Sequence, residues 1–301
     1  MNLVSLTKYS TLSFLKGILV ASITLLGAFV GYISVLLLGL YTPSTPTFLE
    51  DFMSTFYFLL ITAVIAALIG ELFLMLKQRF IERFLSIFIY HFFFYFIIRI
   101  GDGLFLNTKA GFSYEVISHI FPSFLFALVV ALLWRPVGEL TSVFNEASTY
   151  FKFRSNKKWV FRFFIAWICF VPIYYFTNWL LSPFIEPYYS EMGGEVLVVF
   201  NFYTTVIIKF AIGALLVAIL MPIFILWKRS KTSLLFWVGF PIFMLSAVYS
   251  SLIQFWFPTG IRFPYLIQYT LICYLIAIIF VQLFYVPDEN EIIDDHLKWM
   301  Y

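Results

Sequence analysis

Three ionisable side chains stand inside long apolar stretches of this sequence: Glu71, His91 and Lys209. A charged group in hydrocarbon is so costly that such a residue is, by default, a hypothesis about function. A carboxylate there must be protonated, paired or turned towards a wet cavity. We therefore treat the three residues as a candidate intramembrane polar site that could relay protons or contact a solute.

The depth of each residue follows from the helical rise of about 1.5 Å per residue. Glu71 lies about 9 Å inside the basic boundary at Lys77, and His91 lies about 12 Å inside Arg83, near the midplane. Lys209 is closer to the opposite boundary, where a lysine can snorkel to water. Each residue also has a structural interpretation, in which Glu71 is paired and His91 is a neutral imidazole bonded to another helix.

A second polar group could meet near the opposite boundary. Arg99 and Asp102 share a helix face if the helix persists that far, because residues three apart are neighbours. Glu115 and His119 are four apart at the start of the next span. These four residues form a candidate outer-leaflet cluster. The alternative is interfacial residues that share no pocket.

No catalytic or metal-binding motif accompanies these residues. Cys169 and Cys273 lie in separate apolar runs without a CxxC pair, so they imply neither a disulfide nor a zinc site and fit ordinary core positions. The histidines lack HExxH spacing, and there is no Gly-rich nucleotide loop. We predict no catalytic residue, cofactor, metal or nucleic-acid partner. Ser246 and Ser250, four apart in the seventh span, indicate either a packing seam or the lining of a polar pathway.

The composition identifies the scaffold that holds these residues. Of 301 residues, 62% are hydrophobic and only 12% are charged, against about 25% charged in soluble domains. The sequence therefore predicts an all-α, polytopic transmembrane bundle, residues 1–286, in contact with the lipid bilayer. Eight apolar stretches can each cross about 30 Å of hydrocarbon. They cover residues 15–40, 53–76, 84–106, 116–134, 159–181, 196–227, 233–256 and 264–286.

Lysine and arginine predict the orientation of the bundle. Most of the 19 basic residues fall in the two termini and in alternate loops, on one side of the predicted spans. Basic loops stay in the cytoplasm, so both termini are predicted to be cytoplasmic in a plasma (inner) membrane. An even number of spans agrees with this orientation.

Two segments are predicted to lie outside the spans. In residues 137–152, apolar side chains recur every three or four positions, which is typical of an amphipathic helix on the cytoplasmic surface. The tail, residues 287–301, has five acidic residues and one lysine. Such a run is either a solvated face or a segment that docks on the basic loops and is released by salt.

The leading functional hypothesis is a permease or the transmembrane component of a transport system, based on Glu71, His91 and the prolines within spans. The alternative is a non-catalytic membrane subunit or sensor that binds a membrane or cytoplasmic protein through its loops and tail. A third hypothesis is an enzyme that acts on lipid or peptide at the outer face through Arg99, Asp102, Glu115 and His119.

Overall fold

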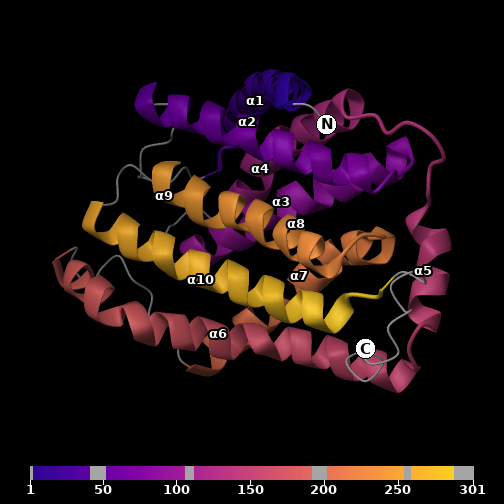
Figure 1. Cartoon of the computed structure of the whole chain (residues 1–301). Coiled ribbons are helices and arrows are strands. Elements are labelled where there is room, and N and C mark those ends of the chain that lie inside the picture. The colour runs from indigo at the N-terminus through magenta and orange to yellow at the C-terminus, as the bar shows by residue number, and fades with distance from the viewer. Residues whose placement is uncertain (1–2, 41–51, 106–111, 192–201, 254–258, 288–301) are drawn as a thin grey trace.

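The computed structural model describes residues 3–40, 52–105, 112–191, 202–253 and 259–287, and every regular element within them is a helix. The long helices run alongside one another (Figure 1). They are α1 (Leu3–Leu37), α2 (Phe52–Met75), α3 (Phe80–Phe105), α4 (Phe112–Leu133), α5 (Val143–Lys152), α6 (Asn156–Glu191), α7 (Phe202–Leu226), α8 (Lys231–Phe243), the π-helical turn η2 (Met244–Val248), α9 (Tyr249–Ile253) and α10 (Thr259–Phe284).

Seven of these helices are long and apolar enough to cross a membrane: α1, α2, α4, α6, α7, α8 with η2, and α10. The prediction of an all-α, multi-pass membrane protein is therefore confirmed. The third predicted span, 84–106, corresponds to α3, whose side chains are described only as far as Phe94. The count of eight spans and the side on which the termini lie stay predictions.

The seventh predicted span, 233–256, is helical as far as Ile253 in the described residues, but it changes helix type. It contains α8, the π-helical turn η2 and then α9, and Met244 and Tyr249 at the two joins keep right-handed helical backbone angles. Pro241 lies three residues before the π-helical turn, and proline both lacks an N–H donor and crowds the preceding turn. Proline alone does not force such a change, since α7 continues as an α-helix through Pro222.

The helices form two halves, each of which packs mainly within itself. In the first half α1 contacts α2 and α4, and α3 contacts α4; in the second half α6 contacts α7 and α10, and α8 contacts α10. The halves meet at α2 and α3 (Figure 1). Helix α2 contacts α8, η2 and α9, and α3 contacts α7 and η2. The centre of the bundle therefore lies beside the π-helical turn.

Glycines allow α1 to approach its two neighbours closely. A Cβ atom at Gly31 would lie 2.7 Å from the carbonyl oxygen of Ser118 in α4, and one at Gly27 would lie 2.8 Å from the Cα of Pro122. Gly17 meets the backbone of α2 in the same way. Small residues four apart are the usual basis of close helix packing in membranes.

The loops predicted to share the basic side do meet at one end of the bundle. Thr141 donates its backbone N–H to the carbonyl of Lys77 at 2.9 Å, and Arg154 donates to the carbonyl of Tyr285 at 2.8 Å. We call this end, which also holds Arg83, Arg135 and Lys228, the basic end. The grouping of these loops is confirmed by their contacts.

Helix α5 lies crosswise to the long helices at the basic end (Figure 1). The helix predicted over 137–152 begins only at Val143, because Gly138 adopts a φ of +97° and Ser142 has an extended conformation at the N-cap. Tyr150 is the side chain that points inward, whereas Phe144 is 80% exposed and Val137 is 90% exposed. The apolar side of α5 around Phe144 is thus available to lipid.

We expect Phe144 to lie in the membrane interface, since an amphipathic helix buries its apolar face at the boundary of the headgroups. A nitroxide label at position 144 should be more accessible to oxygen than to a water-soluble nickel chelate. A label at the exposed Thr149, on the polar face, should show the opposite preference. Equal accessibility at the two positions would contradict an interfacial α5.

Candidate functional site

Glu71 is held by donors from two other segments. The Ser13 hydroxyl of α1 donates to its Oε1, and the Trp134 indole N–H, just past α4, donates to the same oxygen at 3.0 Å. Lys16 lies over the Trp134 ring at 5.2 Å and donates to the Leu133 carbonyl at 3.0 Å. The carboxylate therefore joins α1, α2 and α4 near the basic end, and it stays partly accessible.

Gly70 makes this arrangement possible. A Cβ atom at position 70 would overlap the indole ring of Trp134. The neighbouring glycine therefore leaves room for the tryptophan whose N–H reaches Glu71. The local sequence Gly70-Glu71 thus combines close packing with a polar contact on one helix.

His91 in α3 is buried, with 2% of its surface exposed. Its Nδ1 lies 3.0 Å from the Ser123 hydroxyl of α4, and its ring stacks on Phe126 of the same helix at 3.9 Å. This geometry agrees with an imidazole bonded to a neighbouring helix.

The contacts of Glu71 and His91 lie at different levels of the membrane. Ser123 and Trp134, their respective partners, are separated by about 16 Å along α4 at 1.5 Å per residue. Lys209 belongs to a third place, where it is buried in α7 with its ammonium 3.8 Å from the centre of the Tyr174 ring of α6. These contacts place the three residues beside different partners, and their action as one polar site stays a prediction.

The candidate outer-leaflet cluster falls largely outside the described side chains. Arg99 and Asp102 lie in α3 and Glu115 lies in α4, but their side chains are outside the described residues. Of the four, His119 is described: its Nδ1 lies 2.8 Å from the hydroxyl of Ser118. The convergence of these four residues stays a prediction.

A polar contact at the centre of the bundle was missed from the sequence. The Ser246 side chain in the π-helical turn hydrogen-bonds Cys273 of α10, and Tyr90 of α3 lies near Cys273. Tyr90 is completely buried, and its hydroxyl has no hydrogen-bond partner among the described residues. A buried hydroxyl without a partner is costly, so it is a candidate ligand contact. Nothing in the sequence distinguishes Tyr90 from the other aromatic residues of its span, and Cys273 fits an ordinary core position.

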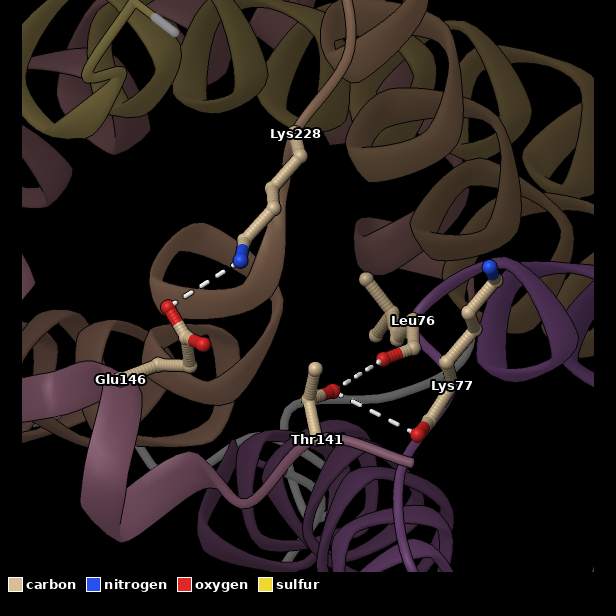
Figure 2. Close-up of polar contacts among 5 residues, drawn as sticks. All are labelled: Leu76, Lys77, Thr141, Glu146 and Lys228. Atoms are coloured by element: carbon tan, nitrogen blue, oxygen red, sulfur yellow. Dashed lines mark hydrogen bonds and ion pairs between the residues drawn. The ribbon is translucent and has the colours of Figure 1, made fainter. Parts of the chain in front are cut away.

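Polar contacts also attach α5 to both halves of the bundle (Figure 2). Thr141, just before α5, donates its hydroxyl to the carbonyls of Leu76 at 3.1 Å and Lys77 at 3.4 Å. Glu146 of α5 forms an ion pair of 3.2 Å with Lys228, which follows α7. The segment that joins the halves is thereby fixed to α2 and to α7.

Glu82, in the first turn of α3, holds the N-terminus of α5. It accepts a hydrogen bond of 2.7 Å from the Ser142 hydroxyl and another of 2.7 Å from the Val143 N–H. A carboxylate at a helix N-terminus satisfies an otherwise unpaired donor and interacts favourably with the helix dipole. This contact explains where α5 begins.

The C-terminal turn of α10 receives donors from α5 and α6. Tyr150 donates to the Phe284 carbonyl at 2.5 Å, Arg154 donates to Tyr285, and Arg162 donates to Leu283. Cations at a helix C-terminus satisfy its last carbonyls. Burial, together with repulsion from Arg162, lowers the pKa of Arg154 to about 10.

Among the described residues, no three histidine, cysteine or acidic side chains are grouped as metal ligands would be. No protein-family model matches this sequence, and neither a curated protein nor a solved structure matches it. The protein is an integral membrane protein by its apolar helices, and its activity is argued from its own residues.

Proposed function

We propose that this protein is a permease or the transmembrane component of a transport system. The observation that carries the proposal is the π-helical turn η2 inside the seventh span, which contacts α2, α3 and α10. Single π-helical turns inside α-helices are frequent at functional sites. The Tyr90 hydroxyl and Ser246 supply polar groups beside this turn.

Glu71 would bind the proton whose movement is coupled to solute transport. Its carboxylate is partly accessible near the basic end and contacts two neighbouring segments, so a change in its protonation would alter contacts among three helices. Ionisable residues within spans mark proton relays in transporters. In this proposal the basic end is cytoplasmic, both termini are cytoplasmic, and the protein lies in the plasma membrane.

The proposal can be tested in proteoliposomes on a solid-supported membrane. We would apply pulses of amino acids, sugars, organic acids, nucleosides and inorganic cations under an inward proton gradient. We expect at least one solute class to give a current that protein-free liposomes lack. We also expect Ser246→Ala to reduce this current, whereas Ser22→Ala on the exposed face of α1 should not. An absence of current for all the solutes would contradict the permease proposal.

A second candidate function is a membrane subunit or sensor that binds a protein partner. Exposed lysines on the α5–α6 corner favour it: Lys152, Lys157 and Lys158 all face solvent. Substitution of these three lysines by neutral residues would then abolish co-purification of an acidic partner while leaving any transport current unchanged. The permease proposal predicts the opposite dependence, on residues at the centre of the bundle.

A further inference from the structure

Three cationic side chains surround the C-terminal turn of α10. Arg154 donates to the Tyr285 carbonyl at 2.8 Å, and Arg162 donates to the carbonyls of Leu283 and, at 3.2 Å, Gln282. Lys231 donates to the Gln282 side chain at 2.7 Å. We call Arg154, Arg162 and Lys231 the cationic cluster.

The acceptors of Arg154 and Arg162 do not balance the charge of these two guanidinium groups. They are neutral carbonyl oxygens, and a helix C-terminus supplies only about half a negative charge. Arg154 and Arg162 also repel Lys231. The Nε and Nη1 atoms of Arg154 are buried and have no hydrogen-bond partner among the described residues, and the guanidinium lies over the rings of Phe153 at 5.2 Å and Trp159 at 5.0 Å. Guanidinium groups whose acceptors are neutral favour a carboxylate nearby.

The chain itself carries carboxylates a few residues beyond α10 in the sequence. Asp288 follows Tyr285 by three residues, and three extended residues span at most about 10 Å. The segment 288–301 holds five acidic residues and one lysine. A tethered segment reaches a nearby site at an effective concentration in the millimolar range, which favours it over an anion that must be recruited from solution.

We propose that residues 288–301 dock on the cationic cluster through their carboxylates. Docking would neutralise the cluster and hold the C-terminal segment against the α5–α6 corner. The inference does not depend on transport activity, because it rests on the electrostatics of the basic end alone. Its occupant is this segment of the same chain, and a lipid headgroup phosphate is the competing occupant that the experiment distinguishes.

Hydrogen exchange of residues 288–301 tests this proposal in the full-length protein in phosphatidylcholine nanodiscs. At about 0.01 M salt, exchange should be roughly threefold to tenfold slower than in an unstructured peptide, as expected for a few exposed ion pairs. At about 1 M salt, where the Debye length is about 3 Å, the protection should disappear. The double variant Arg162→Gln/Lys231→Gln should lose the protection at low salt.

Two further variants keep the result interpretable. Lys157→Gln/Lys158→Gln removes the same charge from exposed positions in the first turn of α6 and should leave the protection intact. Asp288→Asn/Glu289→Gln tests the cluster's partner without altering the C-terminal contacts of α10, and it should reduce the protection. The proposal is overturned if the segment exchanges freely at low salt, if the Lys157 and Lys158 control loses protection equally, or if nanodiscs containing phosphatidylglycerol abolish protection. The last result would assign the cluster to lipid headgroups.

Discussion

Replacement of Gly31 by leucine should separate α1 from α4 and destabilise the protein strongly. The new Cβ atom would lie 2.7 Å from the Ser118 carbonyl oxygen, and this contact involves backbone that cannot rotate away. Pro122 cannot donate the helical hydrogen bond to that carbonyl, so the turn that faces Gly31 is already irregular. Overpacking of this kind costs about 1–3 kcal/mol and more when backbone must move. Heating in detergent followed by size-exclusion chromatography would measure the loss.

The matched control is Ser22→Leu, which adds bulk to the exposed face of the same helix. Its hydroxyl donates to the Ile18 carbonyl within α1 and contacts no other helix in the hydrogen bonds described here. The control should keep the melting temperature of the unmodified protein. If Gly31→Leu melted at the same temperature as Ser22→Leu, the close packing of α1 on α4 would be wrong.

Neutralisation of Glu71 should abolish proton-coupled transport while the protein remains folded. Glu71→Gln preserves the size of the side chain, and its amide oxygen can still accept from the Trp134 indole. What the substitution removes is the gain and loss of a proton. We expect a solute current that no longer depends on the proton gradient, measured in the same proteoliposomes. Glu139→Gln, at an exposed loop position, is the control with identical chemistry.

His91 should behave differently from Glu71 if its contacts are structural. His91→Ala would remove the stacking on Phe126 and leave Ser123 without its imidazole partner inside the protein. A loss of His91→Ala from the membrane, with Glu71→Gln still present but uncoupled from the proton gradient, would assign packing to His91 and coupling to Glu71. Loss of both variants from the membrane would instead make Glu71 structural and contradict its coupling role.

Hydropathy predicts the positions of several helices to within a few residues. The predicted span 53–76 matches α2, Phe52–Met75, and the predicted span 116–134 overlaps most of α4, Phe112–Leu133. The physical reason is that lipid demands about 20 apolar residues and a backbone that satisfies its own hydrogen bonds. The basic loops could be grouped on one side for an equally simple reason, their charge.

The inward faces of these helices could not be predicted from the sequence. In α2 and α7 apolar residues occupy the whole circumference, so no stripe distinguishes the protein side from the lipid side. The sequence predicts that Glu71 and His91 belong to one polar site, whereas the contacts described for them lie at separate levels of α4. Nor does Pro241 alone predict a π-helical turn, since Pro222 leaves α7 unbroken.

The position of α5 between the two halves has a consequence for biosynthesis. Contacts of α1 to α4 lie mostly within the first half, so this half can assemble while later segments are still being translated. Two partners of α5 are made much later than α5 itself: Lys228 follows α7, and Phe284, which binds Tyr150, is 134 residues further along the chain. In the nascent protein, α5 therefore lacks these two contacts until the last helix has been inserted. Their formation marks the completion of the fold.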